Sequence, residues 1–147
     1  MNSDFKDALG CLLDENVRFL VVGGYAVIHY TEPRFTKDLG LWLDPSVENA
    51  RRIVRAFHTF GVPLIEITED DLSVAGTQFM IGIPPNAIDF ITTCSHLVFA
   101  PCWEQRQIVE IDGLLVPYLS RDDLVEAKKF FAREQDKVDL RKLLLCP

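Results

Sequence analysis

Hydrophobic residues recur with a helical period in some segments of the chain and form alternating or continuous apolar runs in others. The helical period predicts helices over residues 3–17, 23–30, 44–61 and 97–106, and one long helix over 120–145. The apolar runs predict strands over residues 17–22, 35–44, 62–67, 77–83 and 86–92, and a hairpin over 107–119. This order of elements predicts an α+β (mixed α/β) domain, in which helices pack against one sheet.

A few residues mark where these elements begin and end. Ser3 or Asp4 is expected to cap the first helix, because short polar side chains accept hydrogen bonds from helix N-termini. Gly61 is expected to end the helix over 44–61. Asp112-Gly113 predicts the tight turn of the final hairpin.

The composition is that of one ordinary domain. The chain has 147 residues, 48% of them hydrophobic, so we expect a single domain over residues 1–147 with a sizeable core. Its apolar runs are far too short to cross a bilayer, and its first ten residues do not have the pattern of a signal peptide. The four cysteines form no CxxC pair and are most simply reduced thiols. We therefore expect a cytoplasmic protein without a membrane partner.

The net charge of −7 argues against a protein that coats nucleic acid through a broad positive face. The acidity is uneven, because residues 121–142 contain seven Lys or Arg and six Asp or Glu. Four cations there could meet an anion: Lys128, Lys129, Arg133 and Lys137. A solvated helix face, with ion pairs one turn apart, is an equally good interpretation of the same pattern.

The segment FTKDLGLWLD, residues 35–44, has a glycine inside an alternating strand. Side chains two residues apart on a strand share a face. Leu39, Leu41 and Leu43 therefore form the core face. Asp38 and Gly40 then lie on the opposite face, where the glycine leaves an empty position beside the acid.

A second acid interrupts an apolar strand in AIDFI, where Asp89 lies between residues that favour the core. If the two strands are neighbours, about 5 Å apart, Asp38 and Asp89 converge on one spot. A hard divalent cation such as Mg²⁺ is the natural ligand for two carboxylates.

The segment VVGGYAV places Gly23-Gly24 between a strand and a helix. Such a turn lets backbone N–H groups approach a phosphate, and a helix N-terminus favours an anion. A purely structural strand-to-helix turn has the same sequence pattern, and the dinucleotide-binding G-x-G-x-x-G is absent.

Three features together resemble the DNA polymerase β-like nucleotidyltransferase superfamily. They are a Gly-Gly turn, a strand that carries an Asp about a dozen residues later, and an Asp on a later strand, which is the third acid of the family pattern. The sequence of these segments is most similar to the minimal nucleotidyltransferases and the AbiEii-type toxin relatives. Three segments carry this resemblance: FLVVGGYAVIHYTEPRFTKDLGLWL, PPNAIDFIT and VEIDGLLVPYLSRDDLVEAKKFFAREQDKVDL.

The resemblance implies an enzyme that binds a nucleoside triphosphate with two Mg²⁺ ions and transfers a nucleotidyl group to a protein, RNA or small-molecule hydroxyl. Asp38 and Asp89 would be the first and third catalytic, metal-binding acids. Four residues would bind the nucleotide: Gly23, Gly24, Arg34 and Lys37. Arg34 and Lys37 also fit plain solvated loop cations. The toxin relatives imply an antitoxin-like protein partner.

In this resemblance the second acid falls on Gly40, which has no side chain. Natural degeneration, a cloning substitution and a site completed by water all fit the sequence, and Glu32 is a loop acid that could reach the site. The alternative function is therefore a catalytically degenerate nucleotidyltransferase fold that acts as a binding or partner protein. We also expect a bulky residue at Gly24 to weaken nucleotide binding without unfolding the protein.

Overall fold

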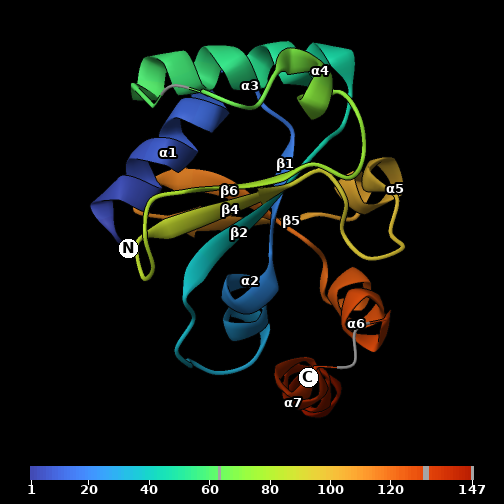
Figure 1. The fold of residues 1–147 in the computed structure, drawn as a ribbon. Coiled ribbons are helices and arrows are strands. Elements are labelled where there is room, and N and C mark those ends of the chain that lie inside the picture. The colour runs from blue at the N-terminus through green and yellow to red at the C-terminus, as the bar shows by residue number, and fades with distance from the viewer. Residues whose placement is uncertain (63, 131–132, 147) are drawn as a thin grey trace.

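The computed structural model describes residues 1–62, 64–130 and 133–146, whose strands form one mixed sheet (Figure 1). The strands are β1 (Phe19–Val22), β2 (Asp38–Leu43), β3 (Gln78–Ile81), β4 (Ala87–Ile91), β5 (Gln107–Ile111) and β6 (Leu114–Tyr118). Their order across the sheet is β3-β4-β2-β1-β6-β5. The pairs β2–β4 and β1–β6 are parallel, and the other neighbours are antiparallel. The expected α+β class is confirmed.

Helices cover both faces of this sheet (Figure 1). One face carries α1 (Ser3–Asp14), α3 (Val47–Phe60) and α4 (Glu69–Leu72). The other carries α2 (Gly23–Tyr30), α6 (Arg121–Phe130) and α7 (Glu134–Leu145), with α5 (Phe99–Glu104) near one end. Among the helices within the described ranges, none combines the length and apolar character needed to span a bilayer.

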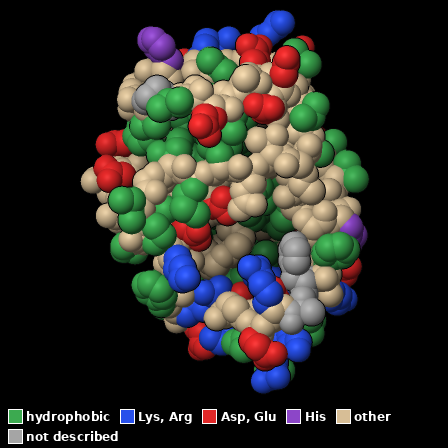
Figure 2. Space-filling view, in the orientation of Figure 1, with side chains coloured by type: hydrophobic (Ala, Val, Ile, Leu, Met, Phe, Trp, Pro, Cys, Tyr) green, Lys and Arg blue, Asp and Glu red, His purple; other side chains and the backbone are tan. Residues whose placement is uncertain are grey.

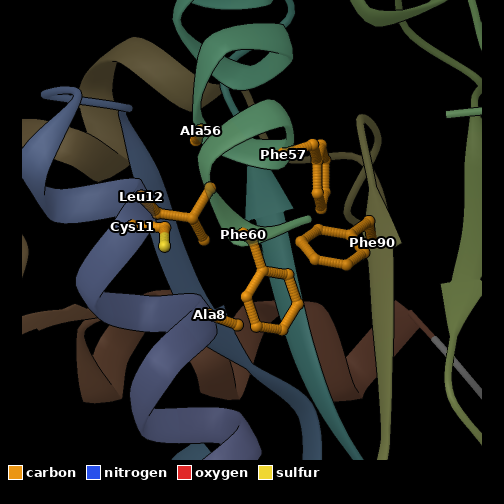
Figure 3. Close-up of a pocket in the computed structure, with 7 residues that line it drawn as sticks. All are labelled: Ala8, Cys11, Leu12, Ala56, Phe57, Phe60 and Phe90. Atoms are coloured by element: carbon orange, nitrogen blue, oxygen red, sulfur yellow. The ribbon is translucent and has the colours of Figure 1, made fainter. Parts of the chain in front are cut away.

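The face under α1 and α3 is the closed core. Leu39, Leu41 and Leu43 of β2 are fully buried, as the alternation predicted. Where α1, α3 and β4 meet, the ring centroids of Phe57 and Phe90 lie 5.2 Å apart, and Phe60 fills the space beside them (Figure 3). This seam leaves no space that a water molecule could enter, so it is core packing and offers no ligand site.

The opposite face is closed over only half of β2. Trp42, which shares this face with Asp38 and Gly40, is buried against Phe99 of α5, with ring centroids 5.0 Å apart. The first half of β2 lacks such a cover and lines a cleft. The structure thus separates a structural half of this strand face from a half that is open to ligands.

The prediction of a single final helix over residues 120–145 is wrong. Arg133 has an extended backbone, with φ −66° and ψ 153°, and α7 begins after it; residues 131 and 132 lie outside the described ranges. The change of direction lets α7 pack against α6, where Asp136 and Asp139 pair with Lys128. These contacts between the two helices take the place of one continuous helix.

Two smaller expectations also differ. No strand forms over residues 62 and 64–67; Leu64 and Ile67 pack on the core while Ile65 is 86% exposed, a spacing of three that does not suit a strand. Asn2, rather than Ser3 or Asp4, caps α1. The end of α3 is as predicted, since Gly61 adopts the left-handed conformation with φ +82°.

Candidate active site

The two predicted acids lie on neighbouring strands. The parallel pairing of β2 and β4 places Gly40 opposite Asp89, and Asp38 two residues away on the same face. The strand spacing and the rise per residue put the Cα atoms of Asp38 and Asp89 about 8 Å apart. Both acids line the same cleft. The predicted adjacency of the two strands is therefore confirmed.

The Gly-Gly turn opens into this cleft as well. Because β1 and β2 are antiparallel, Val22 at the end of β1 pairs with Gly40, and Gly23 and Gly24 follow beside the start of β2. Gly23 has φ +68°, a conformation that glycine adopts without strain. No side chain caps the N-terminus of α2. The N–H groups of its first turn are the kind of donor that binds an anion.

The cleft has a volume of about 830 Å³, within the usual range for a small-molecule site. Its walls come from the strands β1 to β4, the start of α2, the segments 34–37 and 93–95, and the helices α6 and α7. Figure 2 shows a hollow across the middle of this face, with acidic side chains on one side and basic side chains gathered on the other. A ligand that carries both phosphates and a cation would match this separation of charge.

One wall of the cleft is basic, and its cations form ion pairs with buried acids. Lys128, only 9% exposed, pairs with Asp136 at 3.0 Å and with Asp139 at 3.1 Å. Asp139 also pairs with Arg34 at 2.9 Å, and Asp136 with Arg133 at 2.7 Å. Burial raises the pKa of Asp136, but hydrogen bonds from Arg133 and Lys128 outweigh it and hold the pKa below its usual value. Three cations and two acids therefore leave one net positive charge on this wall.

The acidic side of the cleft has the opposite character. Burial raises the pKa of Asp89, the hydrogen bonds from Gln78 oppose that rise, and the negative charge of Asp38 adds to it. The ionised pair is thus held at a cost in the absence of a cation, which is typical of a ligand site.

The donor set fits one Mg²⁺ ion. Within the described ranges, no three His, Cys, Asp or Glu side chains form a group that could hold a metal. Mg²⁺ commonly binds through one or two carboxylates together with water and substrate phosphates, so Asp38 and Asp89 suffice for one ion. The two-metal arrangement that the resemblance implies would lack its second acid at Gly40.

The predicted loop cations differ in their surroundings. Arg34 lines the cleft, and its guanidinium donates to Asp139 and to the backbone carbonyl of Phe35. Lys37 also lines the cleft and is exposed at its rim. Glu32 does not complete the acid set, because its carboxylate pairs with Lys142 of α7 at 3.0 Å.

The four cations predicted over 128–137 divide into two pairs. Lys128 and Arg133 line the cleft. Lys129 and Lys137 lie on the exposed face of α6 and α7, where each pairs with a glutamate of its own helix three residues earlier. Half of the proposed patch is therefore a solvated helix face, and the other half belongs to the site.

Among the polar residues of the cleft that the sequence prediction missed are Asp136, Asp139 and Gln78. A signal for the two acids was present, because Asp136, Asp139 and Leu143 are spaced as one buried helical stripe. Acids on an apolar stripe indicate buried ion pairs. Gln78 had no such signal, since its position depends on the pairing of β3 with β4.

The close approach at Gly24 makes this position more sensitive than the sequence suggested. A Cβ atom at Gly24 would lie 2.4 Å from Oγ1 and 2.9 Å from Cβ of Thr36, and 3.2 Å from the Nη2 atom of Arg34. The segment that leads to Asp38 would have to move. The expectation that a bulky residue spares the fold is therefore replaced by a prediction of lower stability.

We predict that Gly24→Ala lowers the free energy of unfolding by about 1–3 kcal/mol, the usual cost of overpacking. Thermal unfolding measures the loss. Gly10→Ala is the matched control, because a Cβ there meets nothing within 4 Å and alanine favours a helix interior, so this variant should be slightly more stable. Adding Thr36→Gly to Gly24→Ala should recover part of the loss; an additive loss would show that Thr36 is not the obstacle.

Comparison with known proteins supports the fold. The crystal structure of the lincosamide antibiotic adenylyltransferase LnuA, with lincomycin bound, matches 99% of this chain and 97% of its own chain, with a TM-score of 0.62 and 12% sequence identity. No family model and no curated protein sequence matches the chain. At this identity the likeness concerns the fold alone, and the expected nucleotidyltransferase-type fold is confirmed.

Proposed function

We propose that this protein binds a nucleoside triphosphate with one Mg²⁺ ion in the cleft and transfers its nucleotidyl group to an acceptor hydroxyl. The observation that carries the proposal is that Asp38 and Asp89, on paired strands, face the same cleft as the uncapped N-terminus of α2. Carboxylates that bind a cation and backbone N–H groups that bind phosphates are what a metal–nucleotide complex requires.

Each part of the cleft has a role in this proposal. The N–H groups at Gly23 and Gly24 bind phosphate oxygens. Lys128 and Arg133 supply positive charge along the opposite wall. Asp38 and Asp89 hold the metal, which when bound neutralises phosphate charge.

The proposed reaction is a displacement at the α-phosphorus. The acceptor hydroxyl oxygen bonds to that phosphorus, the bond to the oxygen that bridges to the β-phosphate breaks, and pyrophosphate leaves. Asp89 is the candidate acceptor for the hydroxyl proton, because its carboxylate lies in the cleft beside the proposed metal site.

A second candidate function rests on Gly40. Its position opposite Asp89 is where a further acid would face the cation, and it has no side chain. Loss of one metal ligand of this kind is expected to cost at least the 10–100-fold that loss of a supporting group costs. A nucleotide-binding protein without efficient transfer, which acts through a partner, is therefore the alternative.

The nature of the acceptor is part of the proposal. The antibiotic bound to LnuA makes a small-molecule hydroxyl one candidate for this chain. A protein or RNA hydroxyl and an antitoxin-like partner follow from the family resemblance, and a cytoplasmic location follows from the scattered cysteines. All of these stay predictions.

Labelling with NTPs that carry ³²P at the α-phosphate tests the proposed function. Purified protein is incubated with each NTP, with Mg²⁺ or with EDTA, and with pooled RNA, protein or hydroxylated antibiotics as acceptors. Transfer that needs Mg²⁺ and disappears in Asp38→Asn supports the enzyme. Mg²⁺-dependent nucleotide binding without transfer to any acceptor supports the degenerate protein instead.

The raised pKa of Asp89 gives a further prediction. An acid whose pKa is raised in the folded protein destabilises the fold above that pKa. The penalty falls as the pH drops through the folded-state pKa and vanishes below 3.8, where both states are protonated. Asp89→Asn should therefore unfold a few degrees higher than the parent at pH 7 without metal, and the gain should shrink on acidification. The variant should also lose the response to Mg²⁺.

Thermal unfolding at pH 7 and pH 4.5 measures this difference. Asp7→Asn removes the same charge from an exposed position of α1 and is the control for net charge. A parent and an Asp89→Asn variant of equal stability at both pH values would contradict the electrostatic account of the cleft.

A further inference from the structure

Asp139 joins the last helix of the chain to the loop that precedes β2. Its carboxylate is fully buried, and one oxygen accepts a hydrogen bond from Nη2 of Arg34 at 2.9 Å. The other oxygen accepts from Nε2 of Gln135 at 2.8 Å, one turn earlier on the same helix. The helix α7 contacts both α6 and α2 (Figure 1). A residue of α7 therefore fixes the position of an arginine in a distant loop.

The guanidinium of Arg34 lies at the N-terminal opening of α2. A Cβ atom at Gly24 would lie 3.2 Å from Nη2 of Arg34, and Cβ atoms on a helix point toward its N-terminus. The Nη1 atom of Arg34 donates to the backbone carbonyl of Phe35 at 2.8 Å. Contacts to Phe35 and Asp139 on separate nitrogens hold this planar group in one orientation beside the Gly-Gly turn.

Arg34 has N–H donors that these two contacts do not use. Within the ranges that the structure describes, its Nε atom is buried and has no hydrogen-bond partner. A buried donor without a partner is unfavourable, so a native protein satisfies it with a ligand or with water. Arg34 is thus held with donors to spare at the place where the proposed function puts the phosphates of the nucleotide.

We propose that Asp139 is a positioning residue for nucleotide binding, and that it acts through Arg34, whose guanidinium it holds toward the triphosphate. This inference rests on the proposed function, because it assigns a further residue to the same phosphate site. It gives the buried ion pair between Arg34 and Asp139 a role in binding as well as in stability.

Charge alone predicts the opposite effect for Asp139. A carboxylate near a polyphosphate repels it, so removal of the carboxylate would strengthen binding if Asp139 contributed only its charge. Removal of a positioning contact instead leaves Arg34 to be ordered by the ligand, which weakens binding. Lys128 keeps its other pair, with Asp136 at 3.0 Å. The two interpretations therefore differ in the direction of the change in affinity.

Asp139→Ala and Leu143→Ala are a matched pair. Both residues lie on the buried stripe of α7, one turn apart, and both variants should unfold at a lower temperature than the parent. The probe is Mg²⁺–tripolyphosphate, titrated by calorimetry at a temperature at which circular dichroism shows both variants folded. Asp139→Ala should bind it at least about 10-fold more weakly, the loss of one charge-assisted hydrogen bond. Leu143→Ala should bind it as the parent does.

Arg34→Met tests whether the effect passes through Arg34. Addition of Asp139→Ala to Arg34→Met should cause no further loss of affinity, because the group that Asp139 positions is gone. If alanine at position 139 prevents folding, Asp139→Asn is the milder variant, since it keeps one acceptor oxygen. It should also bind tripolyphosphate more weakly than the parent, although it has lost the negative charge.

The outcomes distinguish the inference from the function beneath it. Weaker binding by the Asp139 variants, absent from Leu143→Ala and from the Arg34→Met background, supports the positioning role. Equal or tighter binding by the Asp139 variants, or an equal loss in Leu143→Ala or in the Arg34→Met background, overturns that role and leaves the proposed function standing. A parent that binds neither Mg²⁺–tripolyphosphate nor a non-hydrolysable ATP analogue with Mg²⁺ overturns both.

Discussion

Gly40→Asp is expected to convert a protein that responds weakly to Mg²⁺ into one that Mg²⁺ stabilises strongly. Gly40 lies opposite Asp89 on the face that lines the cleft, so a new carboxylate there would join Asp38 and Asp89. Without metal, three carboxylates repel one another and the variant should unfold at a lower temperature than the parent. At a Mg²⁺ concentration 100 times its dissociation constant, binding adds about 2.7 kcal/mol, roughly 5–10 °C.

The same variant should gain nucleotidyl transfer where an acceptor is present. A restored metal ligand is worth up to about 10³-fold in rate, which corresponds to about 4 kcal/mol of transition-state stabilisation. The ³²P labelling assay measures the gain against the parent.

Gly40→Asn is the control for shape. A Cβ atom at position 40 would lie 3.3 Å from the carbonyl oxygen of Val22 and 3.4 Å from its Cγ2 atom, so any side chain there crowds β1 slightly. Asparagine adds the same crowding as aspartate without the charge. Equal Mg²⁺ responses in Gly40→Asp, Gly40→Asn and the parent would show that position 40 does not face a metal.

The second large effect is expected at Asp139. This carboxylate is fully buried, accepts hydrogen bonds from Arg34 and Gln135, and forms an ion pair with Lys128. Asp139→Asn leaves two partly buried cations with less compensation, and breaking such a pair costs about 3–5 kcal/mol. The unfolding temperature of Asp139→Asn should be about 10 °C lower than that of the parent.

Glu134→Gln is the matched control, because Glu134 is 91% exposed and its pair with Lys137 is a surface contact of α7. Its unfolding temperature should stay within about 1 °C of the parent. An Asp139→Asn variant as stable as this control would mean that the buried ion pairs do not hold α6 and α7 together.

The network also predicts acid behaviour. The lowered pKa of Asp136 means that its contribution to stability is present above pH 3.8 and is lost as the pH falls through the lower, folded-state value. The packing of α7 should therefore resist mild acid.

The alternation of hydrophobic and polar residues along the sequence predicted those parts of the site that depend only on the periodicity of a strand. The alternation in β2 placed Asp38 and Gly40 on one face and the three leucines on the other, since a strand has a fixed period of two. The same alternation predicted that Asp89 faces away from the core. Gly23-Gly24 was found because a strand followed directly by a helix needs such a turn.

What could not be predicted depends on contacts between distant segments. The segment around Arg133 contains neither glycine nor proline, so nothing local interrupts the helical pattern; the ion pairs of Lys128 with α7 stabilise the change of direction. The position of Gln78 beside Asp89 requires the register of β3 against β4. The constraint at Gly24 arises from Thr36, twelve residues away.

The most direct test of the cleft as a metal–nucleotide site is a ¹H–¹⁵N NMR titration of the protein with a non-hydrolysable ATP analogue, with and without Mg²⁺. We predict saturable shifts of the amides at Gly23, Gly24 and Asp89 that grow when Mg²⁺ is present. The same titration of Asp38→Asn should lose the Mg²⁺-dependent part. Shifts confined to other surfaces, or none at millimolar analogue with Mg²⁺, would contradict the proposed site.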